Sequence, residues 1–112
     1  MLPKEKRISY SLFKEISKER GIVYHSPHLS LKVISENEAD FSKFAFVVSK
    51  KVTKLAVKRN LLRRRGYSVI KDLDIKKGFY CIFFFKKGAD KTSFEEIKEE
   101  ITQLLQKAGV VN

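Results

Sequence analysis

The sequence has few of the residues that build disulfides, metal clusters or membrane spans. It contains one cysteine, Cys81, so it can form no internal disulfide and no cysteine-based metal cluster. Its longest apolar run, from Phe79 to Phe85, is far shorter than the roughly 20 residues of a membrane-spanning helix. The opening residues M-L-P-K-E-K-R lack the apolar segment of a signal peptide. We therefore expect a cytoplasmic protein that needs no membrane, with Cys81 buried in a strand.

Acidic residues are missing from the middle of the chain. No Asp or Glu lies between Asp40 and Asp72, so all 13 acidic residues lie outside that stretch. Half of the residues from 50 to 65 are Lys or Arg, namely Lys50, Lys51, Lys54, Lys58, Arg59, Arg63, Arg64 and Arg65. The formal net charge of +11 is thus concentrated. Such a patch favours a polyanion, with nucleic acid the first candidate and an anionic membrane the second.

The hydrophobic pattern predicts one domain spanning residues 1–112. We expect a helix over about 9–20 that ends at Gly21, and strands over 29–33, 41–49 and 79–85. Leu29, Leu31 and Val33 alternate along the first strand, so they should share one face. The last strand is apolar on both faces, which is typical of a central strand.

Two helices complete the pattern. The basic helix should span about 55–73, with Leu55, Leu62, Val69 and Leu73 facing inward, and Gly66 should bend or end it. A final helix should begin at the capping box of Ser93 and Glu96 and end at Gly109. Its outer face should carry Glu95, Glu99 and Glu100. The expected fold class is α+β, a single-sheet sandwich in the order α-β-β-α-β-α, with the basic helix as a crossover.

The basic stretch has the composition of an RNA-binding surface. Lysine and arginine neutralise phosphates, and about six such contacts would give a log–log salt slope near −5. Asn60 adds a neutral donor and acceptor that can orient a phosphate, a sugar hydroxyl or a base edge. The alternative is a solvated helix face on which Asn60 bonds locally.

The motifs of this stretch resemble those of the bacterial ribonuclease P protein subunit. V-S-K-K, A-V-x-R-N and x-x-R-R follow one another in the order of the family motif A-V-x-R-N-R-x-K-R-x-x-R. The matching residues are Ser49, Lys50, Lys51, Ala56, Val57, Arg59, Asn60, Arg63 and Arg64. The strand L-S-L-K-V and the ending K-K-G-A plus a helix also occur in the family's order. The chain departs from the motif at Leu61, Gly66 and Tyr67.

The resemblance implies a protein that assists a catalytic RNA. In that family the RNA uses Mg²⁺, held mainly by the RNA itself, to remove the 5′ leader from precursor tRNA, and the protein carries no catalytic residues. The implied partners are ribonuclease P RNA and precursor tRNA, with no obligate protein partner. The basic residues from Lys50 to Arg65, together with Asn60, would contact the catalytic RNA. Phe13, Leu29 and Leu31 would line a leader groove. Phe13 suits a hydrophobic core equally well, and for Leu29 and Leu31 the core is favoured, because such side chains are most often buried.

Other functional classes fit the residues less well. A protein-only nuclease needs carboxylates that converge on a metal, or a histidine-centred acid and base. Asp72 and Asp74 are only two residues apart, and His25 and His28 flank Pro27 with no second ligand pair at zinc spacing. A structural RNA-binding protein of the ribosomal type is the stronger alternative, because its composition and basic patch would look the same.

Overall fold

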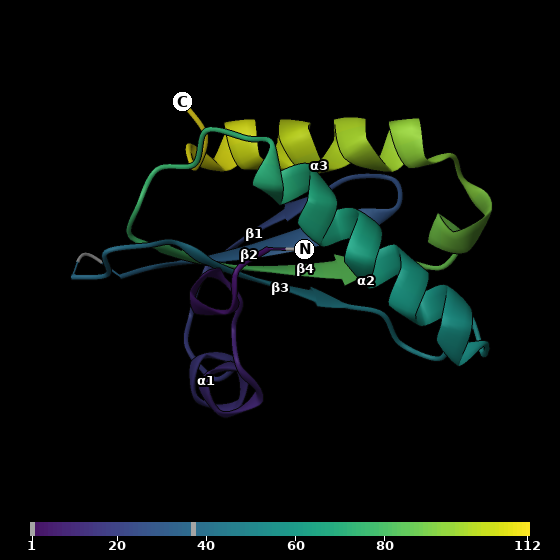
Figure 1. Ribbon diagram of the computed structural model, residues 1–112, viewed down its shortest axis with the longest axis horizontal. Coiled ribbons are helices and arrows are strands. Elements are labelled where there is room, and N and C mark those ends of the chain that lie inside the picture. Colours follow the sequence, from purple (N-terminus) through teal and green to yellow (C-terminus); the bar gives the residue numbers. More distant parts are fainter. Residues whose placement is uncertain (1, 37) are drawn as a thin grey trace.

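The computed structural model describes residues 2–36 and 38–112 as one mixed sheet with helices on both faces (Figure 1). The elements are the turn η1 (Lys4–Lys6), α1 (Tyr10–Ile16), β1 (Ile22–His25), β2 (Leu29–Ser35), β3 (Lys43–Val47), α2 (Ala56–Lys71), β4 (Phe79–Phe85), the turn η2 (Ala89–Lys91) and α3 (Phe94–Ala108). The α+β class and the single sheet are confirmed. None of the described helices is long and apolar enough to cross a membrane.

The sheet has the strand order β1-β2-β4-β3. β4 is central, as its two apolar faces predict, and pairs antiparallel with β2 and parallel with β3. Because β3 and β4 are parallel, the chain must cross over between them, and α2 is that crossover. The basic helix thus starts at the end of the sheet where β3 stops and returns over its face.

The predicted order lacked one strand, β1. This strand has four residues and lies at the sheet edge, and its apolar residues Ile22 and Val23 are exposed. The predicted role of Gly21 as a left-handed helix stop is also wrong, because α1 ends earlier, at Ile16, and Gly21 has no positive φ. A Cβ at Gly21 would lie 2.6 Å from the Val33 carbonyl oxygen. Gly21 is therefore needed for the close approach of β1 to β2.

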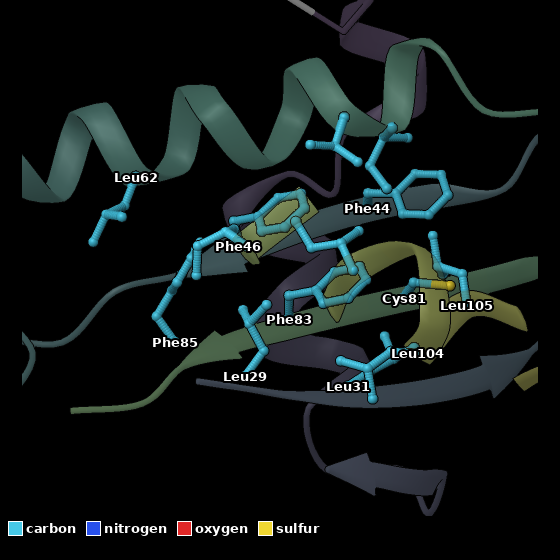
Figure 2. Close-up of a cluster of buried hydrophobic side chains, with 14 of the residues drawn as sticks. Leu29, Leu31, Phe44, Phe46, Leu62, Cys81, Phe83, Phe85, Leu104 and Leu105 are labelled. Carbon is cyan, nitrogen blue, oxygen red and sulfur yellow. The ribbon is translucent and has the colours of Figure 1, made fainter. Parts of the chain in front are cut away.

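The larger core layer lies between the sheet and helices α2 and α3 (Figure 2). Successive side chains of a strand point to opposite faces, so Leu29, Leu31, Phe44, Phe46 and Phe83 all lie beneath these helices. Cys81 has no exposed surface there, and burial raises the pKa of its thiol far above the usual range. The burial expected for Cys81 is confirmed.

A smaller apolar layer covers the opposite face of the sheet, where α1 packs. Ile16, Ile34, Ala45 and Ile82 are buried in it. Around them lie partly buried apolar side chains, namely Ile8, Leu12, Phe13, Val47, Tyr80 and Phe84. α1 has only seven residues, so this layer has partly exposed apolar and aromatic side chains at its margin.

Helix α2 runs without a break through Gly66, contrary to the predicted bend or stop. Gly66 is buried against Phe46, and a Cβ there would lie 2.5 Å from two carbons of that ring. The glycine therefore lets the helix approach the sheet. Leu62 and Val69 are buried as predicted, whereas Leu55 is 58% exposed, because it precedes the helix as its N-cap.

Helix α3 matches its predicted limits. The Ser93 hydroxyl accepts a hydrogen bond from the Glu96 N–H, and Gly109 ends the helix with φ of 74°. Four apolar residues of α3, Ile97, Ile101, Leu104 and Leu105, are buried. Glu100 is buried too, with 6% of its surface exposed, so its predicted place on the outer acidic face is wrong.

Candidate nucleic-acid interface

The basic stretch begins in the loop between β3 and α2. Lys50, Lys51 and Lys54 are exposed in this loop, and Lys58 is exposed in the first turns of the helix. Arg59 is half-buried, and its Nη1 donates a hydrogen bond to the Thr53 carbonyl oxygen at 3.0 Å. Arg59 therefore ties the loop to the helix, so its side chain has a structural role in addition to its charge.

Farther along α2, three of the predicted residues meet in one surface hollow. Asn60, Arg63 and Arg64 line a depression of about 400 Å³ together with Arg7 and Tyr67. The Asn60 Oδ1 accepts a hydrogen bond from Nη2 of Arg63, which orients both side chains. The hollow thus combines three guanidinium groups, an amide and a phenol, and no acidic side chain lines it.

Arg7 and Tyr67 were not predicted as site residues. Arg7 reaches the hollow because the N-terminal segment lies along the outer edge of β3, where Arg7 bridges to Phe44 and the Ile8 N–H donates to the Phe44 carbonyl at 2.8 Å. Tyr67 was noted only as a departure from the family motif. Its ring packs edge-on against Phe46, with ring centroids 5.0 Å apart.

Tyr67 lies between the core and the hollow, because its ring packs against Phe46 and the residue also lines the hollow. Burial raises the pKa of this phenol, whereas a hydrogen bond with the Phe46 backbone and the charges of Arg7 and Arg63 oppose that rise. The net effect is a raised pKa, so the phenol stays protonated at neutral pH and can donate a hydrogen bond.

The remaining predicted residue of α2 points elsewhere. The Arg65 guanidinium lies over the Phe94 ring, 5.6 Å from its centroid, so it faces α3 and not the hollow. Leu61 is 38% exposed and Val57, one helical turn earlier, is 77% exposed. Leu61 therefore places an apolar side chain on the surface where the family motif has an arginine.

A scan against family models matches residues 2–109 to the family described as Ribonuclease P. The chain belongs to this family. Its curated relatives include the ribonuclease P protein components of Microcystis aeruginosa and a Synechocystis strain. The former is 36% identical over 97 residues, which cover 82% of this chain and 81% of the relative. The latter is 29% identical over 113 residues, which cover 99% and 91%.

Solved structures of the family share the fold. The Staphylococcus aureus RNase P protein superposes with a TM-score of 0.78 at 24% identity, covering 96% of this chain and 98% of that one. The Thermotoga maritima RNase P protein gives 0.77 at 22% identity, covering 90% and 96%. At such identities the likeness supports the architecture alone, while the sequence match supports membership of the ribonuclease P family.

Two of the three leader-groove residues expected from the ribonuclease P resemblance cannot line a groove. Leu29 and Leu31 have no exposed surface and lie in the core beneath α2 and α3 (Figure 2). The pleat of β2 sends their neighbours Ser30 and Lys32 to the other face. Phe13 is half-buried on that opposite face, so it is the only one of the three that remains available to a ligand.

A polar cluster of Ser26, His28 and Glu100, which was not predicted, lies at one end of the sheet. The Ser26 hydroxyl donates to Glu100 Oε1 at 2.5 Å, and the His28 N–H donates to the same oxygen at 2.8 Å. The Nδ1 of His28 lies 2.6 Å from Glu100 Oε2. Both Ser26 and His28 bond to the carboxylate, so Ser26 lacks the serine-to-histidine hydrogen bond that a hydrolase triad needs.

Burial alone raises the pKa of the Glu100 carboxyl, but the hydrogen bonds from Ser26 and His28 and the nearby His28 ring outweigh it. The pKa of Glu100 is therefore lowered from its usual value, so the carboxylate is charged at neutral pH. This charge holds the loop between β1 and β2 against α3. In residues 2–36 and 38–112, no three His, Cys, Asp or Glu side chains gather as metal ligands.

Proposed function

We propose that this chain is the protein subunit that binds the catalytic RNA of ribonuclease P and the 5′ leader of precursor tRNA, and so promotes Mg²⁺-dependent 5′ maturation. The observation that carries the proposal is the hollow on α2. It gathers Asn60, Arg63, Arg64 and Tyr67 of a helix without acidic residues together with Arg7 of the N-terminal segment, in a chain of the ribonuclease P family.

The side chains of the hollow are suited to bind the phosphates and sugars of an RNA backbone. Arginine can bind a phosphate through two parallel hydrogen bonds, and Asn60 and Tyr67 can donate to phosphate or sugar oxygens. The bond from Arg63 to Asn60 orients these groups in advance, which lowers the entropy lost on binding. The exposed Lys50, Lys51, Lys54 and Lys58 would add longer-range contacts to phosphates, whose strength depends on salt.

The leader would lie on the α1 face of the sheet, opposite the face that α2 and α3 cover. Phe13, Tyr80 and Phe84 are half-buried there, so each keeps ring surface that a base can stack on. Stacking of this kind is worth about 1–3 kcal/mol per base and tolerates any sequence. Such tolerance suits leaders that differ from one precursor tRNA to another.

The protein's own residues supply binding and no chemical step in this proposal. Mg²⁺ would act within the RNA, since hard cations are commonly held by oxygen ligands such as phosphates. The described acidic residues do not converge as a set of three or more.

The proposal is tested by reconstitution with a bacterial ribonuclease P RNA. Precursor tRNA cleavage at low Mg²⁺ should rise when the protein is added to the RNA. The double variant R63Q/R64Q should lose most of that gain, while K98Q/K107Q, which removes two exposed cations from α3, should keep it. No gain with the unmodified protein would refute the proposed function.

The leader contact has a separate test. Phe84→Ala should reduce the preference of the holoenzyme for precursor tRNA over leaderless tRNA, because a stacking ring is lost. Phe41→Ala removes a half-exposed ring that lines a cavity with Phe44 and Ile70 on the α2 side, so it should leave the preference unchanged. Equal preference in both variants would contradict leader binding on this face.

A structural role in a ribosome-like particle explains the basic surface equally well but not the family match. Cleavage assistance in the reconstitution separates the two, since a purely structural RNA-binding protein would bind RNA without raising cleavage.

A further inference from the structure

The same tripeptide, Lys-Lys-Gly, stands on both sides of β4. Lys76 and Lys77 precede Gly78 before the strand, and Lys86 and Lys87 precede Gly88 after it. The two glycines even share a left-handed conformation, with φ of 95° and 98°. The two turns thus share a tripeptide and the conformation of its glycine, yet β4 places them at opposite ends of the sheet.

The turn before β4 has both acidic and basic residues near it. Lys77 lines a cavity of about 410 Å³ whose wall also includes Asp40, Asp74, Lys6 and Lys71. The Glu36 N–H donates to the Gly78 carbonyl oxygen at 2.7 Å, which brings a further acidic residue to this turn. Asp40, Asp74 and Glu36 thus lie close to this turn, whereas the basic stretch between Asp40 and Asp72 has no acidic residue.

The turn after β4 lies at the basic end of the molecule. Val47 pairs with Phe84 in the parallel β3–β4 ladder, so both strands leave the sheet at this end. The chain after β3 carries Lys50 and Lys51 and leads into α2, and the chain after β4 carries Lys86, Lys87 and Lys91 (Figure 1). Asp90 is the only acidic residue between positions 86 and 93.

Hydrogen bonds hold this second turn in place. The Lys86 N–H donates to the His28 carbonyl oxygen at 2.8 Å, and the Lys86 Nζ donates to the Ser26 carbonyl oxygen at 2.9 Å. Glu100 in turn fixes Ser26 and His28. Three hydrogen bonds thus engage the Glu100 carboxylate. Lys87 and Lys91 are exposed, and Asp90 lies between them in the turn.

We propose that the turn from Lys86 to Lys91 is a second RNA-docking surface, which binds phosphates of the same RNA that lies on α2. This inference rests on the proposed function, because it assumes that RNA approaches the α2 side of this end. Lys87 and Lys91 would contact phosphates, and Lys86 would position the turn. Ammonium groups contact backbone phosphates without reading bases, so the surface should add affinity and not sequence preference.

The turn before β4, with Lys76 and Lys77, provides a control for the loss of two positive charges. The variant K87Q/K91Q removes two exposed lysines at the basic end, and K76Q/K77Q removes two exposed lysines at the opposite end, so the net charge changes equally. Binding to ribonuclease P RNA is measured across a series of KCl concentrations. For K87Q/K91Q we expect the slope of log Kd against log salt to fall by about 1 to 2. For K76Q/K77Q we expect an unchanged slope.

The outcomes separate this inference from the proposed function, with R63Q/R64Q measured alongside. Equal losses in the two lysine variants would overturn the inference, because only the overall charge would matter. No loss in K87Q/K91Q, with weakened binding in R63Q/R64Q, would also overturn it and leave docking on α2 standing. Unchanged binding in R63Q/R64Q would reject docking on α2 itself. Circular dichroism and thermal unfolding of each variant verify that the fold is kept.

Discussion

Helices α2 and α3 cover the same face of the sheet but differ in almost every feature that stabilises a helix. α3 has a side-chain cap at Ser93, a left-handed glycine at its end and four buried apolar residues. α2 starts at Leu55 without a side-chain cap, carries clustered cations, and exposes Val57 and Leu61. Like charges one helical turn apart cost a few tenths of a kcal/mol per pair. The comparison indicates that α3 mainly stabilises the fold, whereas α2 is less stable because it carries clustered cations on its surface.

The largest effects are expected from one substitution in each helix, measured first for stability and then for RNA binding. Leu104→Ala in α3 should lower the free energy of unfolding by about 2–5 kcal/mol, because it leaves a cavity in the core. Arg64→Gln in α2 should change it by less than about 0.5 kcal/mol, because Arg64 is exposed. Urea denaturation measures both values.

RNA binding should show the opposite order. At a temperature where both variants are folded, the L104A variant should bind ribonuclease P RNA with unchanged Kd, and the R64Q variant should bind it more weakly. If Leu104→Ala weakened binding as much as Arg64→Gln, the division of roles between the helices would be wrong.

The next largest effect is expected at Gly66, where α2 touches the sheet. Alanine is favoured over glycine in a helix by about 1 kcal/mol, but the new Cβ would lie 2.5 Å from the Phe46 ring. Overpacking of this kind costs about 1–3 kcal/mol, so Gly66→Ala should destabilise the protein on balance. Ser68→Ala, at an exposed position of the same helix, should be nearly neutral in the same thermal unfolding experiment. A stabilised G66A variant would show that α2 can move away from Phe46.

The difference between the helices also explains which of their features could be predicted from the sequence. The limits of α3 could be predicted because cap, periodicity and terminal glycine are all local signals. The continuation of α2 through Gly66 could not, because the reason is the distant Phe46 ring. The basic residues could likewise be identified, because they are clustered in the sequence. Their contact with Arg7 in one hollow could not be predicted, because it depends on the path of the N-terminal segment along β3.

Glu100 and Leu31 illustrate the two remaining kinds of error. Glu100 was assigned to a solvated face because its burial depends on donors at Ser26 and His28, more than 70 positions away. For Leu29 and Leu31 the resemblance implied a ligand groove, whereas their residue type and alternation favoured the core, and their burial confirms the core. There the residue pattern was the better guide, and the functional analogy was carried to the wrong face of β2.

A smaller effect is expected at the two helix starts. Ser93→Ala removes the cap of α3 and should cost about 1 kcal/mol, whereas Leu55→Ser can supply α2 with a cap that it lacks and should gain up to about 1 kcal/mol. Thermal unfolding of the two single variants measures the opposite signs. Destabilisation by Leu55→Ser would mean that the exposed Leu55 side chain contributes packing that outweighs a cap.

The smallest expected effect concerns acid sensitivity, because burial partly offsets the hydrogen bonds that lower the pKa of Glu100. A carboxyl with a lower pKa in the folded state stabilises the protein above its unfolded pKa of about 4.3, and this contribution is lost as the pH falls through the folded pKa. The difference in unfolding free energy between the unmodified protein and the E100Q variant should therefore be largest near neutral pH and shrink below about pH 4. Glu99→Gln, at an exposed neighbour on α3, should show no such change. A difference for Glu100→Gln that stays constant from pH 7 to pH 3 would show that the carboxylate charge does not hold the β1–β2 loop, and that Glu100 acts on α3 only by its shape.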